Sequence, residues 1–267
     1  MTETFQLTVE QAKAYDDLFV PALFAQWAPQ LVSCARVAPG QRVLDVACGT
    51  GIVARTAAEA VGPLGHVTGL DINPAMLEVA RAVRPDLEWV LGDAEDLPFE
   101  AGSFDAALCQ SALFFFPEPS RAVREMARVV GVGGLVAIQT YASLEEQPAY
   151  GPFMDVVARH AGPEARVLLG TYWSHGDLAG LNQMTAAAGL EVRETRTSLG
   201  VGLFPSTDAV VHTEISATPL GDRLDPVAYG RILADTHEVL GKYAAADGAV
   251  QVPIRATMIA ACRTSAD

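Results

Sequence analysis

The stretch from Val43 to Gly51, VLDVACGTG, constrains the fold more than any other part of this sequence. A mostly apolar run that passes directly into Ala-Cys-Gly-Thr-Gly is typical of a buried parallel strand followed by a tight turn, and a helix is expected from Ile52. Gly49 and Gly51 lack a Cβ, so positive φ is open to them and a ligand can lie against the backbone. The stretch predicts a strand-turn-helix unit with a ligand at its turn.

Strands and helices alternate through the first half of the chain. The apolar patterns predict strands over 42–47, 66–72, 87–93, 104–109 and 135–140, and helices over 52–61 and 119–129 with a third that opens at Asn73-Pro74. This alternation implies a parallel sheet with right-handed crossovers and helices on both faces. Two long strands, over 190–204 and 250–263, follow later, and the last has no crossover helix after it, which predicts an antiparallel edge.

The rest of the chain is mainly helical. Residues 8–36 have helical periodicity that Pro21 and Pro29 interrupt, which predicts two or three helical pieces before the sheet. We therefore divide the chain into four parts. Residues 1–36 form a helical lead-in over the cofactor site, and residues 37–140 form the cofactor-binding core. Residues 141–188 and 206–247 form a helical cap, and residues 189–205 and 248–267 form closing strands of the sheet.

Composition limits the classes of partner. The net charge of −14 disfavours nucleic acid and anionic membranes, because few cations are present to displace their counterions. We therefore expect a small, neutral or weakly polar substrate. The amino terminus lacks a basic start and an apolar run, so we expect a cytoplasmic protein. The four cysteines have no metal-type or disulfide-type spacing, and we expect reduced thiols and no metal.

Polar groups follow three successive predicted strands. The glycine turn ends the first, Asp71 ends the second, and Asp93-Ala94 ends the third. The carboxyl ends of parallel strands form the ligand site of an open sheet. A carboxylate at Asp71 can accept hydrogen bonds from two ribose hydroxyls, and Asp93 with the Ala94 N–H can read the edge of an adenine. The pattern predicts a nucleoside-bearing cofactor.

Two nucleoside cofactors fit this pattern. The run GTGIVA also matches the dinucleotide fingerprint with its permitted final alanine, and Asp71 would suit NAD. Asp45, however, places an acid just before the turn, where it would repel a pyrophosphate and attract a cationic ammonium or sulfonium. The sequence therefore favours S-adenosylmethionine and leaves NAD as the alternative.

At this point the chain resembles a known family. The segments LDVACGTG, GLDINPAMLEVAR, GDAEDLPF, SFDAALCQSALFFFPEP and AVREMARVVGVGGLVAI are similar to the successive motifs of class I S-adenosylmethionine-dependent methyltransferases, in the small-molecule branch of the ubiquinone and menaquinone C-methyltransferases. The resemblance covers about residues 10–140. It implies a Rossmann-like, doubly wound α/β fold whose seven strands have the order 3-2-1-4-5-7-6 with strand 7 antiparallel.

The resemblance also implies roles for individual residues. Asp71 would hold the ribose, Ile72 and Met76 would pack on the adenine, and Asp93 and Ala94 would read its edge. The methionine part would be surrounded by Asp45, Ala47, Gly49 and Gly51, with Gln110 near the methyl group and Tyr15 folded over the cofactor.

The acceptor site is less well specified. Where quinone methyltransferases usually carry a pair of histidines, this chain has Phe114-Phe115. An apolar acceptor pocket could be lined by Phe114, Phe115, Phe153, Tyr172 and Trp173. A general base is needed only for a hydroxyl or an acidic carbon, and the candidates in the predicted cap are His175, His212, Glu214 and His237.

The sequence therefore predicts an enzyme of small-molecule metabolism that transfers a methyl group from S-adenosylmethionine to an O, N or C atom of a largely apolar acceptor. Two alternatives remain open. One is an NAD(P)-dependent oxidoreductase, and the other is a protein that binds S-adenosylmethionine without turnover. The residues give no oligomeric state.

Overall fold

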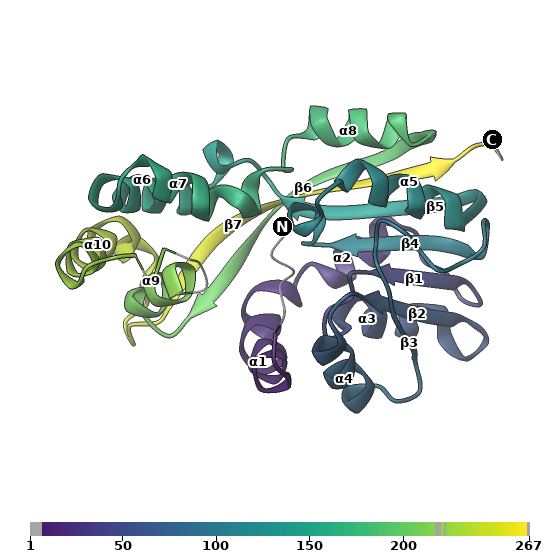
Figure 1. Cartoon of the computed structure of the whole chain (residues 1–267), viewed down its shortest axis with the longest axis horizontal. Helices are drawn as coiled ribbons and strands as arrows, with labels where there is room; N and C mark the ends of the chain where they lie inside the picture. The colour runs from purple at the N-terminus through teal and green to yellow at the C-terminus, as the bar shows by residue number, and fades with distance from the viewer. Residues whose placement is uncertain (1–6, 217–219, 222, 266–267) are drawn as a thin grey trace. The chain divides into compact units, whose positions relative to one another are not determined.

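The computed structural model describes residues 7–216, 220–221 and 223–265, and its centre is one seven-stranded sheet (Figure 1). The strand order is β3-β2-β1-β4-β5-β7-β6, with β7 antiparallel, which confirms the predicted topology. The strands are β1 (Arg42–Val46), β2 (His66–Asp71), β3 (Glu88–Leu91), β4 (Phe104–Gln110), β5 (Val130–Tyr141), β6 (Leu190–Phe204) and β7 (Val250–Arg263).

The first five strands in the order are parallel and in close register. Asp45 on β1 lies opposite Gly69 on β2 and Leu108 on β4, while Asp71 lies opposite Leu91 at the end of β3. The carboxyl ends of β1, β2, β3 and β4 therefore meet at one edge of the sheet. These strands are apolar along most of their length because both faces are covered, and their side chains join one buried core.

Helices start and stop where the local signals predict. α3 (Ile52–Val61) follows Gly51, α4 (Pro74–Val83) follows an Asn73 cap whose side chain accepts the Ala75 N–H at 2.9 Å, and α5 covers Pro119–Val129. β5 begins at Val130, five residues before its predicted start, because Gly131 to Gly134 continue the strand instead of forming a turn. The register shifts between Phe104 and Ala106 on the neighbouring strand.

The lead-in has three helical pieces, but Pro21 does not end one of them. α1 (Val9–Ala14) continues into a π-helix, η1 (Tyr15–Phe24), and α2 (Ala28–Cys34) begins with Pro29 in its first turn. Pro21 lies inside η1, and the Ala25 N–H donates to the Val20 carbonyl, five residues back. The wider turn tolerates a proline because the chain pairs each N–H with a more distant carbonyl.

The chain divides into two compact units. Unit 1 comprises residues 1–140, 178–196 and 257–267, and unit 2 comprises residues 141–177 and 197–256. The helices of unit 2 are α6 (Tyr150–Ala161), α7 (Pro163–Leu169), α9 (Thr207–Ser216) and α10 (Pro226–Leu240). The strands β6 and β7 each contribute residues to both units.

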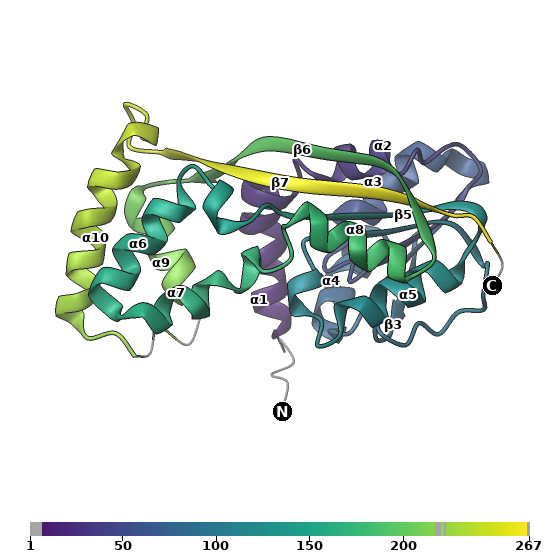
Figure 2. The same ribbon diagram turned by 90° about the horizontal axis from the view of Figure 1, so that it is seen from above.

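One helix of the predicted cap segment 141–188 packs in unit 1. α8 (Leu178–Ala187) lies beside α5, as Figure 2 shows, and Leu181 belongs to the buried core of unit 1.

Short 3-10 helices lie between the other elements. They are η2 (Gly62–Leu64), η3 (Leu113–Phe115), η4 (Leu144–Glu146), η5 (Gly170–Trp173) and η6 (Gly241–Tyr243).

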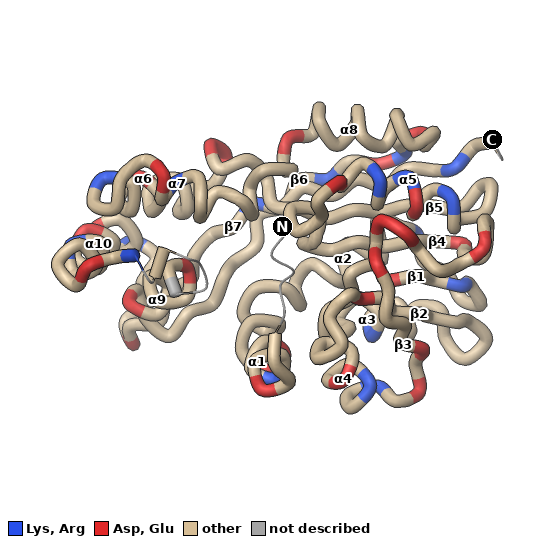
Figure 3. The backbone as a smooth tube through the Cα atoms, in the orientation of Figure 1, with Lys and Arg blue, Asp and Glu red and all other residues tan. Residues whose placement is uncertain are grey.

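Surface charge is mixed in sign. Figure 3 shows Lys and Arg positions interspersed with Asp and Glu, and acidic residues follow one another in the loop between β3 and β4.

Of the helices in the described ranges, none combines the length and the apolar character that crossing a bilayer requires. Cys34, Cys48, Cys109 and Cys262 are free thiols, as predicted, and the first three are buried.

Candidate functional site

Three residues in the turn after β1 have left-handed backbone conformations. Gly49 has φ +55°, Gly51 has φ +88°, and Ala47 also has φ +55°. The Cys48 N–H donates to the Leu70 carbonyl, and the Gly51 N–H donates to the Cys48 carbonyl at 2.8 Å. A positive φ at alanine is uncommon and costs energy, and such strain gathers at functional sites. The sequence gives no sign of it at Ala47.

The two glycines of the turn serve different purposes. A Cβ on Gly51 would run into the indole of Trp89 from β3, whereas a Cβ on Gly49 would meet only the Tyr15 ring, at 3.9 Å. Trp89 also fills the space beside Gly69 on β2. Gly51 is therefore needed for packing between β3 and the start of α3, and Gly49 leaves backbone open beneath Tyr15.

Asp45 lies at the amino end of α3. Its side chain is buried, and its Oδ2 accepts the Ala54 N–H at 2.8 Å. Gly51 has no side chain with which to cap these first N–H groups, so Asp45 does so. The pKa of Asp45 is raised to about 8, because burial and the nearby Asp71 raise it by more than the Ala54 N–H lowers it. The carboxyl group occupies the place where a helix start would hold a pyrophosphate.

Asp71 connects the ends of β1 and β2. Its Oδ2 accepts the Gly49 N–H and its Oδ1 accepts the Asn73 N–H, both at 2.8 Å. Burial raises the pKa of Asp71, and the hydrogen bonds from Asn73, Gly49 and Ile72 lower it. A carboxylate has about four acceptor sites, so each oxygen keeps one for a hydroxyl group.

The loop after β3 presents the predicted adenine-edge residues. Asp93 is exposed and its Oδ1 accepts the Glu95 N–H at 2.8 Å, while Ala94 is buried. Arg128 on α5 holds this loop by donating to the Leu97 carbonyl at 2.9 Å and to the Phe99 carbonyl at 2.7 Å. A fixed loop keeps the Asp93 carboxylate at the carboxyl end of β3.

The lead-in is bound to the glycine turn by Asp16, which the sequence analysis missed. Asp16 Oδ1 accepts the Thr50 hydroxyl at 2.6 Å and pairs with Arg55 at 3.1 Å, and all three side chains are largely buried. A threonine between the two glycines and an arginine in the following helix were the available signals. These bonds hold Tyr15, the neighbour of Asp16, beside the turn.

Gln110 lies at the end of β4, and only one of the two polar atoms of its side-chain amide has a hydrogen-bond partner among the described residues. Its Nε2 donates to the Phe24 carbonyl at 3.1 Å, and its Oε1 is buried with no hydrogen-bond partner among the described residues. A buried oxygen of this kind can accept from an ammonium group. Ser111, the next residue, has φ +52°, a second strained position at a strand end.

The remaining residues of unit 1 have mixed surroundings. Met76 packs against the buried cluster of Ala12, Ala75 and Val79, whereas Ile72 is half exposed. Phe114 and Phe115 have ring centroids 4.6 Å apart, with Phe114 buried and Phe115 exposed. The roles predicted for these side chains stay predictions.

The acceptor-site residues from the predicted cap lie in unit 2. Phe153 and Trp173 are buried, and Tyr172 and His175 are partly buried. Burial lowers the pKa of His175, so its imidazole is neutral at pH 7. His212 is exposed, and His237 is exposed and contacts Asp208 at 2.6 Å. Their roles as bases stay predictions.

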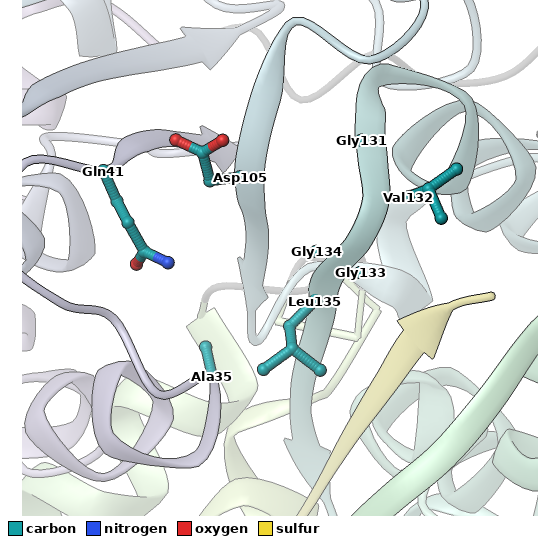
Figure 4. A pocket seen from close by; sticks show the side chains of 8 residues that line it. All are labelled: Ala35, Gln41, Asp105, Gly131, Val132, Gly133, Gly134 and Leu135. Atoms are coloured by element: carbon teal, nitrogen blue, oxygen red, sulfur yellow. The ribbon is translucent and has the colours of Figure 1, made fainter.

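A hollow lies at the opposite end of the parallel strands from the glycine turn. Figure 4 shows its lining, formed by Ala35, Gln41, Asp105, Gly131, Val132, Gly133, Gly134 and Leu135. The carboxylate in this lining, Asp105, already pairs with Arg42 at 3.0 Å. We assign no ligand to this hollow.

Comparisons with known proteins find similarity to methyltransferases. Residues 44–138 match the family described as "Methyltransferase domain". Demethylmenaquinone methyltransferase of Renibacterium salmoninarum is 38% identical over 136 residues, which are 51% of this chain and 54% of that protein. The chain thus spans about half the length of this curated relative.

Solved structures extend the similarity of fold. A candidate methyltransferase of Bacillus halodurans has a TM-score of 0.61 at 22% identity, covering 89% of this chain and 99% of its own. Phosphoethanolamine N-methyltransferase 2 of Haemonchus contortus, solved with S-adenosylhomocysteine, has a TM-score of 0.60 at 19% identity, covering 98% and 58%. Residues 44–138 thus match a methyltransferase-domain family, and the chain shares the Rossmann-like fold of these solved structures.

Proposed function

We propose that this protein transfers a methyl group from S-adenosylmethionine to an O, N or C atom of a largely apolar small molecule. The observation that carries the proposal is the bond between Asp45 and the Ala54 N–H at the start of α3. The carboxyl group occupies the place of the second phosphate of a dinucleotide, and a cation beside it would favour its charged form. The alternative of an NAD(P)-dependent oxidoreductase loses its main support there.

The residues at the strand ends fit the parts of this cofactor. Asp45 and Gln110 Oε1, which has no hydrogen-bond partner among the described residues, would receive the ammonium group, and Asp71 the ribose hydroxyls. The adenine edge would lie at Asp93 and Ala94, with Tyr15 over the turn. Once bound, S-adenosylmethionine supplies an electrophilic methyl group and loses its positive charge on transfer. The protein's task is therefore positioning, which can lower a barrier by roughly 7–11 kcal/mol.

The class of acceptor is part of the proposal. The curated relative is named for demethylmenaquinone, which supports an aromatic, largely apolar acceptor. The Phe114-Phe115 pair departs from the histidines that the quinone enzymes carry, so we propose a different acceptor of similar chemistry. A cytoplasmic location belongs to the same proposal, and cell fractionation would test it.

Calorimetric titration of the whole chain with S-adenosylmethionine, S-adenosylhomocysteine and NAD tests the cofactor. We expect the first two to bind, and binding of NAD alone would overturn the proposal. Asp71→Ala should weaken cofactor binding by about 1.5–3 kcal/mol, because charge-assisted hydrogen bonds to the ribose are lost. Unchanged affinity in this variant would refute the role of Asp71.

Transfer itself needs a second measurement. Incubation with methyl-labelled S-adenosylmethionine and a metabolite extract should label a small, apolar product. Cofactor binding without labelled product under all conditions would favour a protein that binds the cofactor and has no turnover.

A further inference from the structure

The residue that follows β4, Ser111, has a backbone conformation that its neighbours must hold in place. Its φ is +52°, and its side chain is buried. A residue with a Cβ rarely adopts a positive φ, because the conformation costs free energy that the surrounding structure must offset. The bonds that Ser111 makes therefore show what keeps the end of β4 in its shape.

Gln139, on β5, holds Ser111 by two hydrogen bonds. The Ser111 N–H donates to the Gln139 carbonyl at 2.9 Å, and the Ser111 hydroxyl donates to Gln139 Oε1 at 2.7 Å. The Gln139 side chain is fully buried, so water does not compete for the second bond. The first bond needs only the backbone of residue 139, whereas the second needs a side-chain acceptor there.

The amide of Gln139 is only half used. Its Nε2 is buried and has no hydrogen-bond partner among the described residues, which costs free energy. A leucine of similar size would avoid that cost, but it would leave the Ser111 hydroxyl without its acceptor. The bond to Ser111 is therefore what a glutamine supplies at this position and an apolar residue does not.

Gln110 lies next to this pair. It precedes Ser111 in the chain and is opposite Gln139 in the register of β4 with β5, so the two glutamine side chains lie on the same face of the sheet. They do not bond to each other, because Gln110 Oε1 and Gln139 Nε2 both lack a partner in the described ranges. The Gln110 Nε2 instead donates to the Phe24 carbonyl at 3.1 Å.

We propose that Gln139 is a positioning residue for the cofactor, which acts through Ser111 to keep Gln110 Oε1 in place for the cofactor's ammonium group. This inference rests on the proposed function, in which Gln110 lies by the amino-acid tail of S-adenosylmethionine. Gln110 and Ser111 share a peptide bond, so relaxation of Ser111 to a negative φ shifts the end of β4 and Gln110 with it. All three residues belong to unit 1.

Two ligands separate this role from a general effect on the fold. S-adenosylhomocysteine carries the amino-acid tail, whereas 5′-methylthioadenosine has the same nucleoside and sulfur without the tail. In calorimetric titrations of the whole chain, Gln139→Leu should bind S-adenosylhomocysteine about tenfold more weakly, the size expected when a hydrogen bond to a charged group is weakened. Its affinity for 5′-methylthioadenosine should be unchanged.

Two further single variants accompany Gln139→Leu. Ser111→Ala removes the same bond from its other end and should show the same selective loss, so the test does not depend on the folding of one variant. Thr140→Val is the matched control, because Thr140 is the next residue on β5, is buried, and has a hydroxyl without a partner in the described part of the chain. Its side chain lies on the opposite face of the sheet, and both affinities should stay unchanged.

A rescue experiment tests the cause directly. Glycine adopts a positive φ without strain, so Ser111→Gly needs no side-chain bond to keep this conformation. Adding Ser111→Gly to Gln139→Leu should restore S-adenosylhomocysteine affinity to within about threefold of the unmodified chain. Adding Ser111→Ala to Gln139→Leu should restore nothing, because alanine bears the same backbone cost as serine.

Three results would overturn the inference. They are unchanged S-adenosylhomocysteine affinity in Gln139→Leu and Ser111→Ala, an equal loss for both ligands, and no recovery with Ser111→Gly. The unmodified chain is titrated in the same series. If it binds neither ligand, the proposed function fails and this inference fails with it. If it binds S-adenosylhomocysteine and the variants give one of the three results, this inference alone fails.

Discussion

The Asp45 carboxyl group has two roles, one in the structure of the chain and one in the proposed cofactor complex. In the chain without ligand it caps α3, and in the proposed complex it faces an ammonium group. The unliganded carboxyl has a pKa of about 8, so it is mostly protonated at pH 7. A cation beside it favours the charged form and lowers that pKa. Cofactor binding at neutral pH should therefore expel a proton from Asp45.

Calorimetry of S-adenosylmethionine binding at pH 7, in buffers of different ionisation enthalpy, measures this proton. We expect release of up to about one proton, and none from Asp45→Asn. Proton uptake, or equal release by both proteins, would contradict the role of Asp45.

The same group makes stability depend on pH. An unfolded Asp has a pKa of about 3.9, whereas the folded Asp45 has a pKa of about 8. Between these values the folded chain binds more protons than the unfolded chain, so the free energy of unfolding falls as pH rises and levels off above pH 8. The Asp45 contribution has a slope of up to about 1.4 kcal/mol per pH unit. Urea unfolding of Asp45→Asn should show a shallower fall, with Asp71, whose pKa is also raised, supplying part of the remainder.

Individual site residues were predictable to different degrees. The positions of Asp45, Asp71 and Gly49 at strand ends could be predicted, because local sequence pattern defines where these strands end. Asp16 could not, because its bonds to Thr50 and Arg55 cross more than thirty positions and depend on the path of the π-helix. The left-handed φ of Ala47 could not either, since alanine carries no signal for it.

At the scale of elements, the strand-turn-helix unit depends on Trp89 as much as on its own glycines. Gly51→Ala would combine a left-handed φ with an overlap on the Trp89 ring. Gly40→Ala is the matched control, because Gly40 has φ +82° and an added Cβ there meets nothing within 4 Å. Both variants bear the backbone cost of about 1–2 kcal/mol. Gly51→Ala should lose roughly 2 kcal/mol more in urea unfolding, the cost of overpacking.

A second result checks the cause of that difference. Trp89→Leu should reduce the extra cost of Gly51→Ala in a double-mutant cycle, because the ring that overlaps the new methyl group is gone. Equal losses for Gly40→Ala and Gly51→Ala would contradict the packing role of Trp89.

The π-helix is the element that local pattern predicted least well. A proline normally ends or kinks an α-helix, so Pro21 predicts a helix end, yet η1 continues through this residue. Asp16→Ala removes the bonds to Thr50 and Arg55, so amide hydrogen exchange over 15–24 should become about tenfold faster. Asp17→Ala, at an exposed neighbouring position, should leave it unchanged. Equal exchange in both variants would show that Asp16 does not hold the lead-in.

At the scale of the molecule, the order of strands followed from pattern and resemblance, but the extent of unit 1 did not. Its core includes Leu181, Leu190, Ile259 and Ala261, which come from beyond residue 140. Arg263 adds hydrogen bonds to the Arg128 and Val130 carbonyls at 2.9 and 2.7 Å. Only the folded chain brings these late segments to the early strands.

A fragment of residues 1–140 contains the matched domain and lacks those contacts. We expect it to lose near-ultraviolet circular dichroism and to unfold in urea without a sharp transition, because part of its apolar core is uncovered. The whole chain is the control and should unfold with a steep transition at the urea concentration where unit 1 melts. A sharp transition in the fragment would show that the early strands suffice.

The chain leaves unit 1 after residue 140 and again after residue 196, and each time it comes back. Both excursions are insertions into a scaffold that carries every motif of the matched domain. Residues 141–177 and 197–256 can therefore diverge between homologues while residues 44–138 keep the matched domain. Under the proposed methyl transfer, exchanging these two segments between homologues would give chimaeras that keep residues 44–138 and differ in the rest of the chain.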